Sequence, residues 1–366
     1  MQPIVQRNLS EIRISAWNID GIWRRWNSFR YSKLNDPYVQ KQLIKFKIFG
    51  LLETHHTAAE EGNLHIQNFK CFSLCRPKSK NVKRHKASGG IAVYVHDSIK
   101  QGVRKIPIPG TECIILKLCQ SFFGLQTDVF VCFAYCVPSN SAVLSREFMP
   151  SDIYNDLREK LAQLTQLGSI VLLGDMNART KTLPDFINNE SNEHIPLPPS
   201  ELYEPDTIGT TERNNLDTGY NAYGVRLLEL CKEVPLRILN GRFVGDLFGS
   251  LTCFRPNGAS CVDYGAVSPA LFSAIRYFRV EPHMPTVSDH SPISLGLSAN
   301  VSIVSCRTEY NFVDKPGKIY WDPKKKEDFC SVLMSTSNQG RLQAFLDVLT
   351  QTRHLLMLQQ ALSPPL

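Results

Sequence analysis

The sequence predicts an α+β domain with a two-sheet core and helices outside it. Apolar runs of strand length recur along the chain, and few helical patterns separate them. Some of these runs, such as Ile48–Leu52 and 170–173, are apolar throughout, which indicates strands buried on both faces. The 366 residues are 43% hydrophobic, enough for one large globular domain or two ordinary ones.

The expected elements follow one another along this pattern. Ile12, Ile14 and Ala16 alternate with polar residues, which predicts a half-buried strand that ends at Asn18. Ser151 is a candidate N-cap for an amphipathic helix. We expect helices at 37–45, 151–167 and 223–232, and further strands at 48–52, 89–95, 113–118, 129–135, 170–173, 236–239, 251–254, 261–267, 277–280 and 292–297.

The pattern also suggests how the chain is divided. Residues 1–298 form the expected globular domain, and its long polar stretch at 181–221 is typical of a surface or substrate-facing insertion. Residues 299–338 are predicted to be a basic connector. Leucines at helical spacing predict an amphipathic helix and tail over 339–366, where a protein partner could dock.

Charge and cysteine usage restrict the class of protein. The net charge of +7 suits a polyanionic partner, although a solvated basic surface would have the same charge. The 11 cysteines lie mainly in apolar runs, which is typical of buried thiols in a reducing compartment. Cys71 and Cys75, with His85 beyond, lack a second matching pair, so no structural zinc is expected there. There is no secretory signal and no apolar run of the ~18 residues that a membrane span needs, so we expect an intracellular chain.

Polar residues with the chemistry of phosphodiester hydrolysis stand at the ends of four apolar strands. Oxygen ligands suit a hard cation such as Mg²⁺, and the reaction also needs groups that activate water and stabilise charge on phosphorus. Taken singly, each cluster could be an ordinary turn or cap. The clusters are Asn18 with Asp20, Glu53 with Thr54 and His55, Asp175 with Asn177, and Asp289 with His290.

Five motifs in order give the chain a resemblance to the endonuclease/exonuclease/phosphatase superfamily, over about residues 12–298. They are Trp17-Asn18-Ile19-Asp20-Gly21, Leu52-Glu53-Thr54-His55, Gly174-Asp175-Met176-Asn177-Ala178-Arg179, Val262-Asp263-Tyr264 and Ser288-Asp289-His290-Ser291-Pro292-Ile293. Within the superfamily, a further set of motifs resembles the apurinic-like endonuclease domain of non-LTR (LINE-type) retrotransposons. They are Glu53-Thr54-His55, Gly89-Gly90-Ile91-Ala92-Val93-Tyr94, Asn221-Ala222-Tyr223-Gly224, and Ile238-Leu239-Asn240-Gly241-Arg242 with Gly245-Asp246, Gly249 and Thr252-Cys253 beyond it. The resemblance implies a DNase I-like fold, a four-layer α/β/β/α sandwich.

The resemblance also implies a role for each matched residue. Asp20, Glu53 and Asp289 would hold Mg²⁺, or Mn²⁺ in its place, and no small-molecule cofactor is implied. The catalytic residues would be Asn18, which orients Glu53 and the phosphate; Tyr135 and Asn177, which contact the scissile phosphate; Asp175, which positions or deprotonates water; and His290, oriented by Asp263. Whether Asp175 or His290 is the base is left open by the sequence.

The implied activity is nicking of DNA to leave a 3′-hydroxyl, in a retrotransposon-derived protein that acts in the nucleus. Basic residues in two expected loops, over Trp23–Trp26 and 76–86, are candidates for phosphate contacts. The predicted DNA-binding residues are Arg24, Arg25, Lys83, Arg84, Lys86 and Arg179. The alternatives are a phosphatase or phosphodiesterase of the same superfamily that acts on another substrate, and a co-opted, catalytically silent module that binds DNA or a partner.

Overall fold

The computed structural model describes residues 5–26, 29–76, 88–107, 112–138, 153–187 and 206–305, together with 331, 334, 335, 339, 340 and 343. The chain divides into two compact units, Met1–Arg307 and Thr308–Leu366. The sheets and helices below belong to the first unit. The predicted basic connector and C-terminal helix lie almost wholly outside the described residues, as does the expected N-cap Ser151.

Two six-stranded sheets form the core of the first unit. The first has the order β15-β16-β1-β4-β6-β5, and the second has the order β11-β14-β10-β9-β8-β7. The strands of the first sheet are β1 (Val5–Asn18), β4 (Ile48–Leu52), β5 (Phe69–Leu74), β6 (Ile91–His96), β15 (Ile275–Val280) and β16 (Ile293–Ser305). Those of the second are β7 (Val103–Ile106), β8 (Cys113–Leu118), β9 (Val129–Tyr135), β10 (Ser169–Asp175), β11 (Arg237–Ile238) and β14 (Asp263–Val267).

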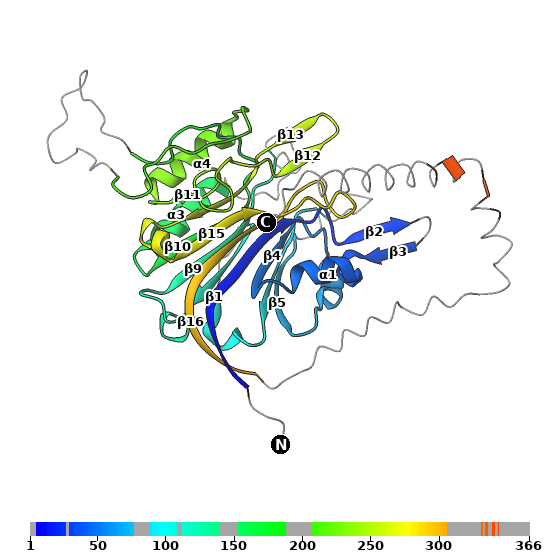
Figure 1. Ribbon diagram of the computed structural model, residues 1–366, viewed down its shortest axis with the longest axis horizontal. Coiled ribbons are helices and arrows are strands. Elements are labelled where there is room, and N and C mark those ends of the chain that lie inside the picture. The colour runs from blue at the N-terminus through cyan, green and yellow to red at the C-terminus, as the bar shows by residue number, and fades with distance from the viewer. Residues whose placement is uncertain are drawn as a thin grey trace, which may run out of the picture. The chain divides into compact units, whose positions relative to one another are not determined.

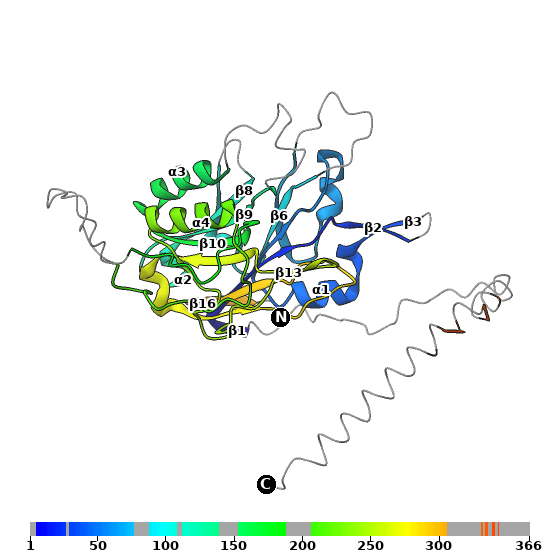
Figure 2. The same ribbon diagram turned by 90° about the horizontal axis from the view of Figure 1, so that it is seen from above.

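Helices cover the outer faces of both sheets, which gives four layers (Figures 1 and 2). The helices α3 (Ile153–Thr165) and α4 (Ala222–Glu233) pack on the second sheet, and α1 (Pro37–Leu43) packs on the first. Shorter helices are η1 (Lys33–Asn35), η2 (Ala58–Leu64), η3 (Lys100–Gly102), α2 (Gln120–Phe123) and η5 (Pro269–Ala274). The predicted α/β/β/α sandwich is confirmed.

Alternate side chains of one strand pack into two different hydrophobic cores, one on each face of the sheet, which explains the continuous apolar runs. On β9, Val131 and Phe133 point into the core between the sheets, whereas Phe130 and Cys132 face α3 and α4. The sheets approach closely over Gly50, where a Cβ atom would lie 2.3 Å from the ring of Phe133.

Two short hairpins extend from the sandwich. The first pairs β2 (Trp23–Trp26) with β3 (Phe29–Ser32), and the second pairs β12 (Cys253–Arg255) with β13 (Gly258–Ser260). The expectation of a loop at Trp23–Trp26 was therefore wrong, because its residues pair with a second strand. Strands β5 and β7 were also missed, and β1 and β16 run further than predicted, β16 as far as Ser305. Among the described residues, no helix is long and apolar enough to cross a membrane.

Candidate active site

The topology brings the ends of strands from both sheets together. Strand β1 runs parallel to β4, so Asn18 lies beside Leu52 and the chain then turns at Glu53. Strand β9 runs parallel to β10, and Asp175 at the end of β10 pairs with Tyr135 on one side and Asp263 on the other. Residues that are far apart in sequence therefore face one space at one end of the sandwich.

Asn18 connects the two sheets within this space. Its buried side-chain Nδ2 donates to Oε2 of Glu53 at 2.8 Å and to Oδ2 of Asp175 at 2.9 Å. The backbone N–H of Asp20 donates to Oδ1 of Asn18 at 3.0 Å, which fixes the orientation of the amide. One side chain thus positions a carboxylate from each sheet.

Glu53 is partly open to solvent and is held as a carboxylate. Burial acts to raise its pKa, but hydrogen bonds from His55, Asn18 and Tyr135 outweigh burial and lower the pKa to about 2. Nε2 of His55 lies 3.3 Å from Oε1 of Glu53. Both residues have left-handed backbones, with φ of 53° at Glu53 and 52° at His55, which is a costly conformation for side chains of this size.

Asp175 is buried, and its pKa moves in the opposite direction. Burial and the nearby charge of Asp263 raise the pKa of Asp175 to about 7, although His290 and the N–H of Asn177 act to lower it. That N–H donates to Oδ1 of Asp175 at 2.9 Å, and Nδ2 of Asn177 donates to the carbonyl of Cys136 at 2.7 Å. A carboxyl that titrates near neutral pH suits proton transfer.

His290 and Asp263 form a buried pair beside Asp175. Nδ1 of His290 lies 2.8 Å from Oδ2 of Asp263. Burial acts to lower the pKa of His290, but the charge and hydrogen bond of Asp263 outweigh it and raise the pKa well above its ordinary value. This pairing orients the imidazole and favours its protonated form.

The loop that carries His290 is fastened to β1. Oγ of Ser288 donates to the carbonyl of Asn18 at 2.7 Å and accepts the N–H of His290 at 3.0 Å. The indole N–H of Trp17 donates to the carbonyl of His290 at 2.9 Å. His290 and Asn18 are therefore held in a fixed relation.

Tyr135 closes one side of the space at the end of β9. Burial and the neighbouring carboxylates of Glu53 and Asp175 raise the pKa of its hydroxyl far above the ordinary value, so the phenol keeps its proton. The guanidinium of Arg76 lies 5.8 Å from the centre of the Tyr135 ring, and its Nη2 donates to Oε2 of Glu112 at 2.6 Å. The phenol is a hydrogen-bond donor at this position.

Solved structures with the same architecture include an AP endonuclease and the catalytic domain of a second protein. The AP endonuclease LMAP from Leishmania major matches at 15% identity over 81% of this chain and 92% of that chain, with a TM-score of 0.52. The catalytic domain of APE2 from Xenopus laevis matches at 14% identity over 80% and 94%, also with a TM-score of 0.52.

The chain has the DNase I-like fold. The endonuclease domain of TRAS1, a telomere-specific non-LTR retrotransposon, also matches, at 15% identity over 79% of this chain and 98% of that chain, with a TM-score of 0.46. No protein-family model matches the sequence, and a search of curated proteins found no significant match.

The predicted metal residues are only partly gathered at this end of the DNase I-like sandwich. Asp20 is exposed, and Oδ2 of Asp289 accepts from Nε of Arg255 at 3.1 Å. Among the described residues, the groups that could hold a metal here are Asp175 with Asp263 and His290, and Cys253 with Asp289 and His290. Asp20, Glu53 and Asp289 do not form such a group. Mg²⁺ commonly takes one or two carboxylates and keeps several waters, so the ionised Glu53 fits it as a principal ligand.

The predicted DNA-binding residues are in different situations. Arg24 is half-buried on β2, while the side chain of Arg25 and all of Lys83, Arg84 and Lys86 lie outside the described residues. Arg179 pairs with the buried Asp217, Nε to Oδ2 at 2.9 Å and Nη2 to Oδ1 at 2.5 Å, so its guanidinium holds a loop.

Sequence reasoning missed three residues at the site. His55 was quoted in a motif but given no role, although it contacts Glu53. Cys253 pairs with His290 in a β-bridge, and nothing in its apolar context indicates this. Lys33 is buried, and its Nζ donates to the carbonyls of Ile19 at 2.6 Å and Asp20 at 3.0 Å. Lys33 stands between Ser32 and Leu34, and this context does not distinguish it from a solvated lysine.

Proposed function

We propose that this chain is a Mg²⁺-dependent endonuclease that hydrolyses DNA phosphodiester bonds and leaves a 3′-hydroxyl. The observation that carries the proposal is the bridge that Asn18 makes between Glu53 and Asp175. It places a carboxylate that stays ionised next to one that titrates near neutral pH, and the Asp263–His290 pair lies beside them.

Glu53 would hold the metal ion, and Asp20 and Asp289 would contact it as further ligands or through water. When bound, Mg²⁺ supplies positive charge for the phosphate oxygens, and Mn²⁺ could replace it. Asn18 holds the carboxylate of Glu53 in place, and His55 supports its other oxygen. These contacts position the ligand before the metal arrives.

Proton transfer divides between Asp175 and His290. Asp175 is deprotonated above about pH 7 and accepts a proton from the attacking water. His290, protonated beside Asp263, donates a hydrogen bond from Nε2 to the charged oxygens on phosphorus or protonates the leaving oxygen. Asn177 and Tyr135 supply further donors to the phosphate.

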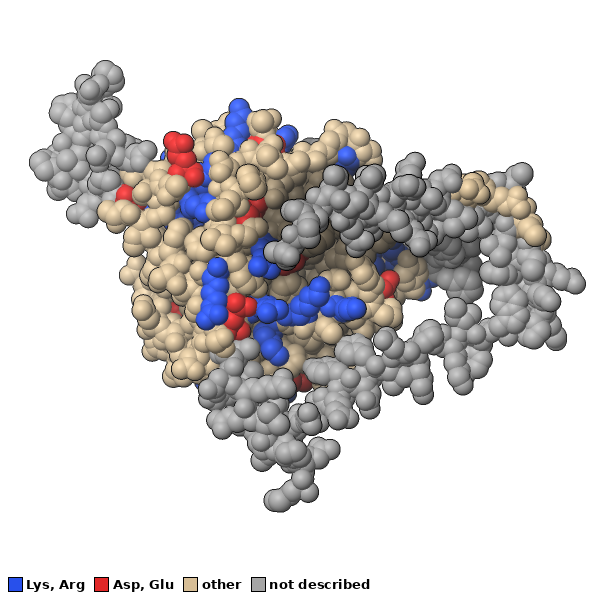
Figure 3. Space-filling model, viewed as in Figure 1, with Lys and Arg blue, Asp and Glu red and all other residues tan. Residues whose placement is uncertain are grey.

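DNA is the proposed substrate because of the motifs and the charge. The motifs that begin at Glu53, Gly89, Asn221 and Ile238 resemble those of retrotransposon endonucleases, and the net charge is +7. Lys and Arg side chains form a group near the centre of the face drawn in Figure 3. We propose a retrotransposon-derived protein that acts on nuclear DNA, with the C-terminal segment as a docking element for a protein partner.

Nicking of supercoiled plasmid tests the proposal. Purified full-length protein is incubated with plasmid and Mg²⁺ beside Glu53→Ala and His290→Ala, and relaxed circles are quantified. We expect nicking by the wild type, stopped by EDTA and lost in both variants, with a 3′ end that a polymerase extends without further processing.

Arg158→Ala is a matched control, because Arg158 makes an exposed ion pair with Glu233 on the outer helices. Its activity should equal that of the wild type. Equal nicking by all four proteins would contradict the proposal. Release of phosphate from inositol phosphates without nicking would favour the phosphatase, and DNA binding without turnover would favour the silent module.

A further inference from the structure

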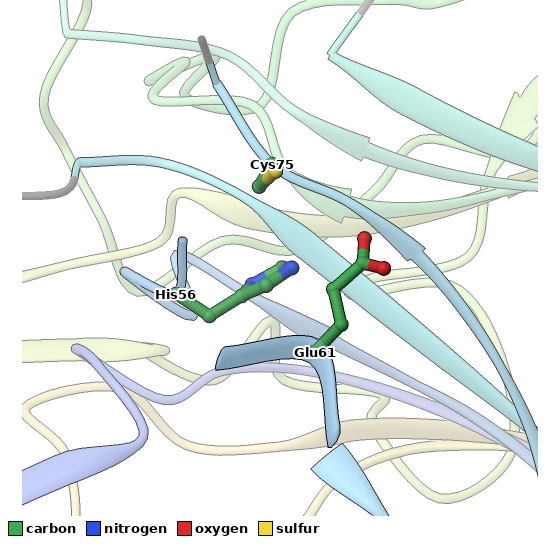
Figure 4. Close-up of side chains that lie close together, drawn as sticks. All are labelled: His56, Glu61 and Cys75. Atoms are coloured by element: carbon green, nitrogen blue, oxygen red, sulfur yellow. The ribbon is translucent and has the colours of Figure 1, made fainter. Parts of the chain in front are cut away.

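A second group of possible metal ligands lies apart from the catalytic residues. It consists of His56 just after the Glu53 turn, Glu61 in η2 and Cys75 directly after β5. Figure 4 shows the ring of His56 and the carboxylate of Glu61 pointing toward one another, with the sulfur of Cys75 beside them. One imidazole nitrogen, one carboxylate oxygen and Sγ lie within 4.8 Å of one another.

Of the two ring nitrogens of His56, one has a hydrogen-bond partner and the other has none. Its Nδ1 lies 2.6 Å from Oγ1 of Thr54, a contact that fixes the orientation of the ring. Its Nε2 is buried and has no hydrogen-bond partner, and the whole residue is only 2% exposed. A buried ring nitrogen without a partner is costly unless something binds it. Burial also lowers the pKa of His56, and the neutral ring is the form that ligates metals.

We propose that His56, Glu61 and Cys75 bind a zinc ion, at a site separate from the proposed Mg²⁺ site. Thiolate, imidazole and carboxylate are the ligand types that Zn²⁺ takes, and the sulfur excludes Mg²⁺ and Ca²⁺. Zn²⁺ lies about 2.0–2.3 Å from such ligands, so small side-chain adjustments would bring all three atoms to one ion. Glu61 is exposed, which leaves room for water as a fourth ligand.

The site would brace the turn that carries Glu53. The N–H of Thr54 donates to the carbonyl of Gly90 at 3.1 Å, and the N–H of Ile22 donates to the carbonyl of Thr54 at 2.9 Å. The turn is therefore already hydrogen-bonded to the residue before β6 and to the loop after β1. A zinc ion bound to His56 would also be coordinated by Glu61 of η2 and by Cys75 after β5, and would therefore connect the turn to both elements. Because Glu53 and His55 adopt costly left-handed backbones, coordination of a metal by His56 would stabilise this turn.

Cobalt substitution in the full-length protein tests the site. Metal-free protein is titrated with Co²⁺ under reducing conditions, and its absorption spectrum is followed. We expect a thiolate-to-cobalt charge-transfer band that Zn²⁺ abolishes by displacement, and a rise in Tm with Zn²⁺. Cys75→Ser should lose the band and the Tm rise, and Thr54→Val should weaken zinc binding by about 10- to 100-fold, because Thr54 orients the ligand.

Two matched variants separate this site from others. Cys71→Ser, on β5 and also half-buried, should keep the band and the Tm rise. Cys253→Ser should also keep the band, because Cys253 belongs to the group around His290. A band that survives Cys75→Ser, or that only Cys253→Ser removes, would overturn the proposal, as would the absence of any band in the wild type. Equal Tm values for Cys75→Ser and wild type in EDTA would exclude misfolding as the cause of the lost band in this variant.

Discussion

Glu53 and Asp175 accept hydrogen bonds from the same nitrogen of Asn18, yet their pKa values move in opposite directions. Glu53 stands at the end of the first sheet, partly open, and donors around it lower its pKa to about 2. Asp175 stands at the end of the second sheet, 1% exposed and beside Asp263, and its pKa rises to about 7.

The difference shows that donors alone do not set the charge of a carboxyl. Full burial removes the hydration that stabilises an ionised group, and a like charge nearby adds to the cost. The first sheet therefore supplies Glu53, which stays ionised and can bind a cation. The second sheet supplies Asp175, which titrates near neutral pH and can accept a proton. A pair of groups with separated pKa values is the arrangement expected for acid–base work.

The largest effect is expected from Asp263→Asn, which would bring the two pKa values closer together. The substitution removes the charge that raises the pKa of Asp175 and also the partner that orients His290. Nicking should fall by up to about 10⁴-fold, as for the corresponding change in Ser-His-Asp enzymes. The acidic limb of the pH–rate profile of the residual activity should move to lower pH. An unchanged profile would argue against coupling between Asp263 and Asp175.

Asp175→Asn should separate activity from stability. Loss of the general base should lower nicking by about 10²–10⁴-fold. Because the pKa of Asp175 is raised on folding, its protonation stabilises the fold at low pH, and that contribution is lost as pH rises through about 7. Tm in EDTA should therefore fall less in the variant than in the wild type between pH values below and above about 7. A parallel fall in both proteins would contradict the raised pKa.

Glu53→Gln should act on the metal rather than on the proton. The amide keeps the shape but removes the charge, so the Mg²⁺ concentration for half-maximal nicking should rise by at least about 10- to 100-fold. The pH at which activity rises should stay that of the wild type, since Asp175 is unchanged. Restoration of nicking by excess Mg²⁺ checks this, and a shifted pH profile with unchanged Mg²⁺ dependence would reverse the two assignments.

The smallest effect on activity is expected from Lys33→Met. The ammonium of Lys33 donates to two carbonyls after β1, and methionine would leave both without that donor. The free energy of unfolding should fall by about 1–3 kcal/mol, because buried acceptors lose their partner. Activity should change only a few-fold, since β1 itself holds Asn18. Urea unfolding measures the first quantity, and a loss of nicking without a loss of stability would assign Lys33 a direct role.

The central strands could be predicted from the sequence, whereas two of the four edge strands of the large sheets could not; the other two, β15 and β11, were expected at 277–280 and 236–239. The predicted bounds of β4, β8 and β9 agree with the structure because these strands are buried on both faces and, apart from the half-buried Lys117 of β8, apolar. Strands β5 and β7 lie at sheet edges and carry lysine or arginine, so no apolar run marks them.

The sequence by itself determined which residue types were available for catalysis and that each stood at the end of an apolar strand. Local pattern carries this information, because burial sets the strand and the first polar residue ends it. Only the tertiary structure decided that Asn18 donates hydrogen bonds to both Glu53 and Asp175. It also decided the ion pairs of Arg179 with Asp217 and of Arg255 with Asp289. It also decided that Cys75 faces His56 and Glu61 rather than another cysteine. Contacts and pKa values depend on distances between segments remote in sequence, and no local pattern encodes those distances.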